Sequence, residues 1–250
     1  RCWMPLTSTA EAIVAGNRRA LAKAITLVES SRAKDREASE QLLNELLPHT
    51  GKSLRLGITG VPGVGKSTFI ETFGQHVIAE GHKVAVLAVG PSSPKAGGSI
   101  LGDKTRMELL SRESRAFIRP SPAGRALGGV ALKTRESMLL CEAAGFDVVI
   151  VETVGVGQSE HQVGSMVDFF LILLLPGGGD ELQGIKKGIL ELADAIMINK
   201  ADGESASLAR KTKLHYQTAM SLLSTGDFWT PEVHTCSALK QEGLTECWAM

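Results

Sequence analysis

One glycine-rich stretch of the sequence has residue types and spacing that suit the binding of a phosphate chain. It fits the pattern GxxxxGK[ST] in full and consists of Gly60, Val61, Pro62, Gly63, Val64, Gly65, Lys66 and Ser67, with Thr68 directly after. The glycines allow main-chain N–H groups to turn toward an anion, and the N-terminus of a following helix adds its dipole. Lys66 is expected to reach the β- and γ-phosphates, and the Ser67 hydroxyl to bind Mg²⁺. The pattern, a P-loop, therefore predicts a site for a nucleoside triphosphate and Mg²⁺.

A second set of residues predicts which base this nucleotide carries. Asn199, Lys200 and Asp202 form the pattern NKxD directly after an apolar run. The Asp202 carboxylate can accept hydrogen bonds from the N1–H and 2-amino groups of guanine, whereas adenine offers neither donor. Ser237 and Ala238, after the next apolar run, are expected to contact guanine O6 through the main chain. Asp202 and the glycine after it could also form a simple turn, but next to a P-loop the pattern favours GTP and GDP.

Residues on the phosphate side are candidates for holding the metal and sensing the γ-phosphate. Glu152 ends the buried run 147–151, a position at which nucleotide hydrolases hold Mg²⁺ directly or through water. Gly155 could offer its N–H to the γ-phosphate, so that residues 156–162 would change order between GTP and GDP states. Gln158 could orient the attacking water. The alternatives are a surface charge at Glu152 and an ordinary polar loop residue at Gln158.

A further acidic candidate lies in the glycine-rich stretch 97–106. Asp103 could be a second carboxylate at the metal, and Lys104 and Arg106 could face phosphate or a partner protein. As the residue before a helix, Asp103 would also serve well as an N-cap. The candidate catalytic residues are thus Lys66, Asp103, Glu152 and Gln158.

The elements that must position these residues are short apolar strands that alternate with helical stretches. The expected strands are Leu54–Thr59, Val84–Val89, Ala116–Arg119, Val148–Glu152, Phe169–Leu175, Ala195–Asn199 and Val233–Ser237. Strands rich in Val and Ile that alternate with helices predict a mainly parallel sheet covered on both faces. Ligands of such sheets bind at the carboxyl ends of the strands, where the candidate residues fall. The sequence thus predicts an α/β fold with a doubly wound, mainly parallel sheet of the P-loop NTPase type.

The first 50 residues have a different character. They are rich in Ala, Leu, Glu and Arg, and we expect two helices here, near Thr9–Glu29 and Asp35–Leu47. The expected organisation is an N-terminal helical segment, 1–50, followed by a P-loop GTPase domain, 51–250.

The overall composition gives no support to nucleic-acid or membrane binding. Among 250 residues, 27 Lys and Arg balance 27 Asp and Glu, so no net charge attracts a polyanion. The longest apolar run, Phe169–Leu175, is far shorter than the ~20 residues of a membrane-spanning helix. The four cysteines form no CxxC pair, and small buried thiols at Cys141 and Cys236 fit a reducing compartment. We therefore expect a cytoplasmic protein without nucleic-acid or membrane partners.

With these motifs together, the chain resembles the MeaB/ArgK family of G proteins. The segments that carry the resemblance are Gly60–Thr68, Ala88–Met107, Arg119–Gly129, Glu152–Glu160, Gly177–Gly188 and Asn199–Gly203. The resemblance implies a GTPase with slow intrinsic turnover that acts as a chaperone for an adenosylcobalamin-dependent acyl-CoA mutase, such as methylmalonyl-CoA mutase. It also implies a homodimer and a third mobile switch loop, Pro176–Lys187, in which Lys186 and Lys187 transmit the binding of the mutase.

The chain departs from the family pattern at three places. Gly90 stands where the family has an aspartate near Mg²⁺, so the resemblance predicts weaker metal binding or slower hydrolysis. In the stretch 121–125 the arginine is displaced by one position. Because the sequence ends at Met250, the C-terminal arm that family members use in dimerisation is expected to be missing.

Three other functions are compatible with some of these motifs. A nickel-type metallochaperone GTPase has similar motifs but carries a metal-collecting Cys/His cluster, whereas the six histidines here are scattered along the sequence. A transport-associated ATPase or kinase would match older labels for arginine and ornithine transport, but NKxD argues against an adenine nucleotide. The third is a nucleotide-binding module without useful hydrolysis, which Gly90 makes more credible.

Overall fold

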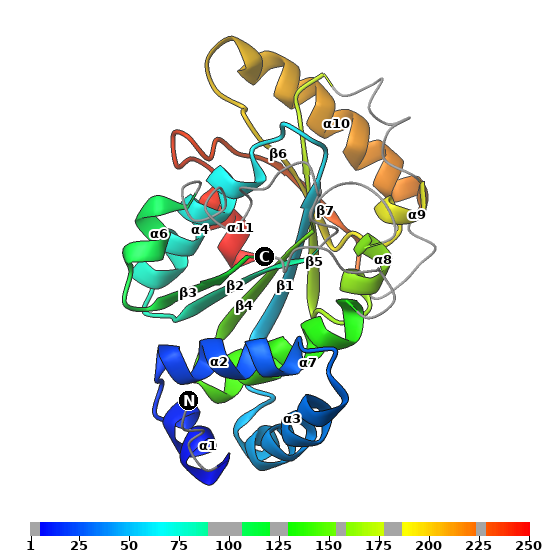
Figure 1. The fold of residues 1–250 in the computed structure, drawn as a ribbon. Coiled ribbons are helices and arrows are strands. Elements are labelled where there is room, and N and C mark those ends of the chain that lie inside the picture. The colour runs from blue at the N-terminus through cyan, green and yellow to red at the C-terminus, as the bar shows by residue number, and fades with distance from the viewer. Residues whose placement is uncertain (1–5, 90–106, 121–129, 154–158, 178–186, 224–228) are drawn as a thin grey trace.

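A computed structural model of the chain describes residues 6–89, 107–120, 130–153, 159–177, 187–223 and 229–250. These residues form one sheet of seven parallel strands in the order β3-β2-β4-β1-β5-β6-β7 (Figure 1). The strands are β1 Leu54–Gly60, β2 Val84–Val89, β3 Ala116–Arg119, β4 Val148–Thr153, β5 Phe169–Leu174, β6 Ala195–Ile198 and β7 Glu232–Thr235. Every expected strand is present, and the prediction of a doubly wound, parallel α/β sheet is confirmed.

The strand order places β1 in the middle of the sheet, between β4 and β5. Leu54 pairs with Val148 at one end of the β1–β4 ladder, and Ile58 pairs with Glu152 at the other. The chain runs from β1 toward one edge through β2 and β3, then returns and continues toward the other edge. The loop after β1 therefore lies next to the point where the strand order reverses, which is where open α/β sheets bind their ligands.

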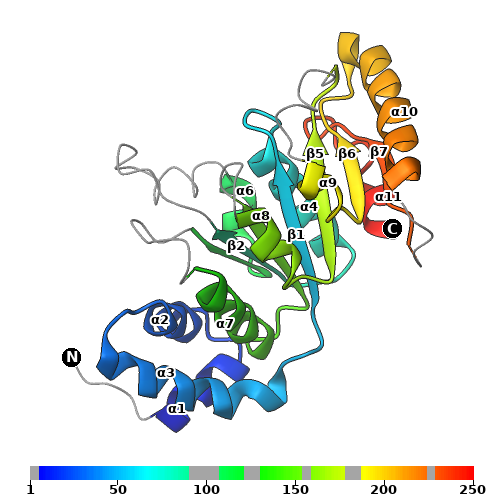
Figure 2. The same cartoon turned by 90° about the vertical axis from the view of Figure 1, so that its right-hand side faces the viewer.

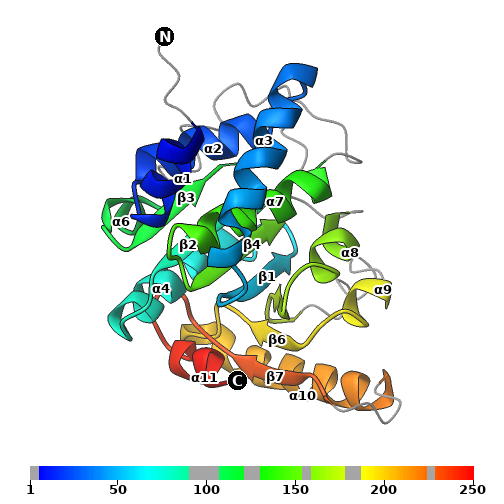
Figure 3. The ribbon, with the colours of Figure 1, turned by 90° about the horizontal axis from the view of Figure 1, so that it is seen from below.

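Helices cover both faces of the sheet (Figures 1 and 3). One face carries α4 Lys66–Ala79, α6 Glu108–Arg112 and α11 Leu244–Ala249. The other carries α7 Val130–Ala143, α8 Ser159–Gly164, α9 Lys187–Leu190 and α10 Ala206–Leu223. Strand residues such as Ile58, Val149 and Ile172 are fully buried between these layers, as expected for a sheet with no solvated face.

The described part of the N-terminal segment, from residue 6 on, contains three α-helices, so the prediction of a single helix over Thr9–Glu29 is wrong. The helices are α1 Leu6–Val14, α2 Arg18–Val28 and α3 Ala33–Leu46, followed by the 3-10 turn η1 Leu47–His49. The break lies at Gly16, whose φ of 78° is left-handed, and at Asn17. The Asn17 side chain accepts hydrogen bonds from the N–H groups of Arg19 and Ala20 at 3.0 and 3.1 Å, and so caps a new helix. The second expected helix is present as α3.

The three N-terminal helices form an extra layer outside α7 (Figure 2). Both α2 and α3 pack against α7, which itself packs on β2 and β4. At the inner end of this layer, Glu142 of α7 accepts a hydrogen bond from the N–H of Gly51 at 2.7 Å and from Arg55 Nε at 2.6 Å. This carboxylate joins the end of the helical segment to the start of β1. Over the described parts of the chain, no helix combines the length and apolar character needed to cross a membrane.

Candidate functional site

The predicted phosphate-binding loop joins β1 directly to α4. The strand ends at Gly60 and the helix begins at Lys66, as the P-loop pattern requires. Gly63 and Gly65 have φ values of 80° and 90°, a left-handed conformation that residues with a Cβ rarely adopt. A Cβ on Gly65 would also lie 3.2 Å from Asn199 Nδ2. Glycine at these positions therefore gives the loop its turn and lets the base-side residues approach it.

Lys66 folds back across the loop. Its Nζ donates a hydrogen bond to the carbonyl of Gly60 at 2.9 Å. Burial lowers the pKa of Lys66 below its ordinary value, and the nearby carboxylates of Glu152 and Glu160 oppose that shift. A partly desolvated ammonium interacts more strongly with an anion than one in water. The geometry therefore suits Lys66 for a phosphate contact inside the loop.

The base-side residues Asn199 and Lys200 bind the P-loop main chain. Asn199 Nδ2 donates to the carbonyl of Val64 at 2.8 Å, and Asn199 is 2% exposed. Lys200 Nζ donates to the carbonyl of Gly63, also at 2.8 Å, from a residue whose own φ is 58°. Both bonds connect segments more than 130 residues apart in sequence. The structure thus brings two independently predicted motifs into one site.

Asp202 and the segment after β7 complete the base side. Ser237 Oγ donates to Asp202 Oδ1 at 2.7 Å, and the main-chain N–H of Ala238 donates to Asn199 Oδ1 at 3.1 Å. The predicted contact of Ser237 and Ala238 with guanine O6 stays a prediction. What the structure adds is a role for the Ser237 hydroxyl, which holds the carboxylate expected to read the base.

Glu152, the carboxylate predicted to face the metal, lies on β4 beside β1. It is 8% exposed and pairs in register with Ile58, one residue before Thr59. The hydroxyls of Thr59 and Thr153 hydrogen-bond at 2.7 Å and fix the carboxyl ends of β1 and β4 to each other. Ser67 lies in the first turn of α4, directly after Lys66. A hydroxyl and a carboxylate are hard oxygen donors of the kind that Mg²⁺ prefers, so the residues present fit this ion.

Glu160 is a buried carboxylate near Lys66 that the sequence patterns do not single out. It lies in the first turn of α8, is fully buried, and raises the pKa of Lys66 through its charge. An acidic residue in a first helical turn is usually a solvated partner of the helix dipole, which conceals a functional position. The feature of the sequence that could have indicated Glu160 is its position at the end of the glycine-rich stretch that begins at Glu152.

Several predicted residues lie outside the described parts of the chain. They are Gly90, Asp103, Lys104, Arg106, Gly155, Gln158 and Lys186, and for Lys187 only the main chain is described. Their predicted roles stay predictions. Within the described residues, no group of three or more His, Cys, Asp or Glu side chains is arranged to hold a metal ion by itself.

Comparison with known proteins places this site in a family. Residues 21–250 match the sequence profile of the family described as methylmalonyl Co-A mutase-associated GTPase MeaB. A putative GTPase of Caulobacter vibrioides is 61% identical, with 98% of this chain and 75% of that protein covered. The GTPase ArgK of Escherichia coli is 56% identical, with 93% of this chain and 71% of that protein covered.

A solved structure shows the same fold. The crystal structure of a protein titled LAO/AO transport system kinase superimposes with a TM-score of 0.83 and 44% identity, and the match covers 99% of this chain and 75% of that one. Sequence profile, identity and fold agree with the P-loop and NKxD geometry described above. The chain belongs to the MeaB family of methylmalonyl-CoA mutase-associated GTPases, and is a P-loop GTPase.

Proposed function

We propose that this chain is a GTP-hydrolysing switch that serves as a chaperone for an adenosylcobalamin-dependent acyl-CoA mutase, such as methylmalonyl-CoA mutase. The observation that supports the nucleotide most directly is the pair of 2.8 Å hydrogen bonds from Asn199 and Lys200 to the P-loop carbonyls. They hold the NKxD motif directly against the P-loop, so that one nucleotide could contact both motifs. A chance NKxD sequence on a surface turn would have no reason to contact this loop.

Each end of the nucleotide would have its own protein groups. Asp202 would accept the N1–H and 2-amino hydrogen bonds of guanine, and Ser237 would keep its carboxylate in place. The P-loop N–H groups and Lys66 would bind the β- and γ-phosphates. Ser67 and Glu152 would hold Mg²⁺, which when bound neutralises charge on these phosphates. The protein groups would thus position the phosphates and stabilise their charge, which is what phosphoryl transfer requires.

The mutase partner rests on the family and on its printed description. A homodimer and a cytoplasmic location belong to the same proposal. In the described part of the chain, Cys141, Cys236 and Cys247 are free and buried, which fits a reducing compartment. A nickel-type metallochaperone is not favoured, since the match is to the MeaB family. A transport-associated ATPase or kinase is not favoured either, because the NKxD motif, in which Asp202 would accept the hydrogen bonds of guanine, argues against an adenine nucleotide.

The test is GTP turnover by the purified protein with Mg²⁺, measured with and without a methylmalonyl-CoA mutase and adenosylcobalamin. We expect slow basal hydrolysis of GTP, much slower hydrolysis of ATP, and acceleration by the mutase. The Lys66→Ala variant is the control for contaminating hydrolases and should show no turnover. Equal use of ATP and GTP would refute the guanine assignment. Absence of acceleration by the mutase would refute the chaperone role while leaving the GTPase intact.

A further inference from the structure

The C-terminal end of α2 contacts the chain on both sides of the stretch between β3 and α7. Arg119 is the last residue of β3, and Lys133 lies in the first turn of α7. Arg119 binds the Glu29 side chain, and Lys133 binds the main chain of Glu29 and Ser30, the two residues that directly follow α2. We call these four residues, Glu29, Ser30, Arg119 and Lys133, the α2 clamp. The clamp ties the N-terminal helical layer to the sheet through contacts between residues that are 90 and 104 positions apart in the sequence.

The first half of the clamp is a partly buried ion pair. The Arg119 guanidinium binds both carboxylate oxygens of Glu29, with Nε at 3.4 Å from Oε1, and its Nη2 lies 3.3 Å from Thr26 Oγ1. The side chains of Arg119 and Glu29 are 26% and 12% exposed. A guanidinium that binds both oxygens of a carboxylate, with so little exposure, has a fixed orientation. Solvent and salt screen such an ion pair only weakly, unlike an ordinary surface ion pair.

The second half of the clamp uses the main chain at the helix end. Lys133 Nζ donates to the carbonyls of Glu29 and Ser30 at 2.7 and 2.9 Å. The last carbonyls of a helix have no partner within the helix and carry partial negative charge, so an ammonium is favourable there. The same helix end therefore fixes both the end of β3 and the start of α7.

The clamp lies close to the metal side of the nucleotide site. In the sheet, Arg119 pairs in register with Leu87, and Leu87 pairs with Val151, the residue before Glu152. Because two strand spacings separate β3 from β4, the main chain of Arg119 lies about 10 Å from that of Val151. β3 has only four residues and is an edge strand of the described sheet, held by β2 alone. The clamp therefore supplies the second support for the carboxyl end of β3.

We propose that Glu29 is a positioning residue for the nucleotide site, acting through Arg119 and thereby through the carboxyl ends of β3, β2 and β4. This inference rests on the proposed function as a Mg²⁺-dependent GTPase. The N-terminal helical layer thereby contributes to nucleotide binding on the side of the site that would hold Mg²⁺. The base-side residues follow β6 and β7, at the opposite side of the sheet from β3, so we expect the clamp to leave base binding unchanged.

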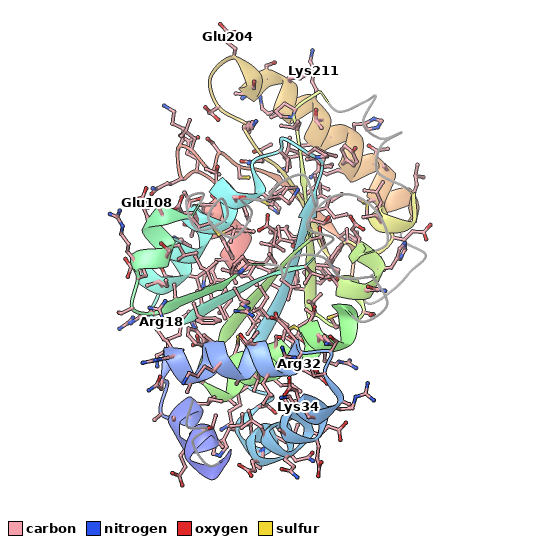
Figure 4. The ribbon with its side chains drawn as sticks, in the orientation of Figure 1. Arg18, Arg32, Lys34, Glu108, Glu204 and Lys211 are labelled. Atoms are coloured by element: carbon pink, nitrogen blue, oxygen red, sulfur yellow. The ribbon has the colours of Figure 1, made fainter. Side chains whose placement is uncertain are left out.

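The experiment compares four variants with the parent: Glu29→Gln, Arg119→Gln, the double variant, and Arg18→Gln as a matched control. Arg18 lies at the other end of α2, where its Nη1 donates to the carbonyl of Glu113 at 3.3 Å, before β3 begins. Figure 4 labels Arg18, the first residue of α2, and Arg32, which lies just beyond the clamp and precedes α3. The measurements are calorimetric GDP affinity with and without Mg²⁺, GTP kcat and KM, melting temperature, and amide hydrogen exchange at residues 116–119.

In Glu29→Gln we expect faster exchange at 116–119, at least a threefold loss in the strengthening of GDP binding by Mg²⁺, and unchanged GDP affinity without Mg²⁺. The double variant should lose no more than either single variant, because the two side chains act through one contact. Arg18→Gln should leave exchange and metal dependence within twofold of the parent. A lowered melting temperature in Glu29→Gln with unchanged metal dependence and exchange would overturn the inference. A parent protein that binds GDP but does not hydrolyse GTP would refute the proposed function alone, and the metal-dependent binding would still test the clamp.

Discussion

Ser237 Oγ donates a 2.7 Å hydrogen bond to Oδ1 of Asp202, so the carboxylate that should read the base is held by a residue from the segment after the neighbouring strand. The same hydroxyl accepts a hydrogen bond from the N–H of Lys240 at 3.1 Å. One Asp202 oxygen is thereby fixed in direction before any nucleotide arrives. A fixed acceptor loses less entropy when the base binds than a freely rotating one would.

Base specificity should therefore depend on Asp202. In Asp202→Asn, we expect GTP affinity to fall on the order of 10²-fold, because two hydrogen bonds to a charged acceptor are worth about 1.5 kcal/mol or more each. Affinity for xanthosine triphosphate should rise, since that base presents an acceptor where guanine has its 2-amino group. Titration calorimetry with GTP and with xanthosine triphosphate measures this change in nucleotide preference. A variant that keeps the parent's preference for GTP would show that Asp202 does not face the base.

The link between Lys200 and the P-loop should matter for both ends of the nucleotide at once. Lys200→Ala removes the 2.8 Å bond from Nζ to the carbonyl of Gly63. We expect GTP and GDP to lose affinity by a similar factor, about fivefold for a bond of ~1 kcal/mol. Lys240→Ala is the matched control, an exposed lysine near the same site. A loss confined to GTP would place the effect at the γ-phosphate instead.

The sheet could be predicted from the sequence because its signals are local. The run Val84–Val89 is apolar throughout and follows a helix that ends near a glycine, and β2 has the same bounds as predicted. The helical break at Gly16 was missed because the residues on both sides favour helix, and only the glycine and the capping side chain of Asn17 mark it. The P-loop lies between β1 and α4, and NKxD directly follows β6, which is the structural context that these patterns predict.

Features that depend on tertiary pairing could not be predicted. Nothing near Ser237 in the sequence indicates that its hydroxyl meets Asp202, because the bond spans 35 residues. The ion pair of Glu29 with Arg119 spans 90 residues and joins two charged residues that look solvated when read locally. The burial of Glu160 likewise follows only from how α8 packs on the sheet.

The affinity for GTP should decrease at alkaline pH because the pKa of Lys66 is lowered by burial. Its protonated form binds phosphate, so affinity is full below the lowered pKa of the free protein and declines as pH rises through it. The decline should begin at a lower pH than an ordinary lysine would give. Lys66→Arg is the control, because arginine keeps its charge throughout this range. Fluorescence titration of GTP at increasing alkaline pH should show a steeper decline in affinity for the parent than for this variant.

The described cysteines should be unreactive in the native protein. Burial raises the pKa of the Cys247 thiol to about 12, and raises the pKa of Cys141 and Cys236 as well. At pH 8 about 10⁻⁴ of the Cys247 thiols would be ionised, against roughly a tenth or more for a free thiol. Alkylation by iodoacetamide, followed by peptide mass spectrometry, should label these three positions only after urea is added. Rapid native labelling of Cys236 would mean that the segment after β7 opens readily.

The stability of the join between the helical segment and the sheet should depend on Glu142. Its side chain is 1% exposed and receives hydrogen bonds from Arg55 Nε and from the N–H of Gly51. Removing one partner of such a buried pair leaves a charge and an N–H group unsatisfied, so Glu142→Ala should lower the free energy of unfolding by about 3 kcal/mol. Arg55→Ala should cost less, because its side chain is 20% exposed and the Gly51 bond remains. Urea denaturation of both variants and of the double variant gives the coupling between them. If Glu142→Ala costs no more than a typical surface substitution, about 0.5 kcal/mol, then the helical segment is not anchored to β1 through this carboxylate.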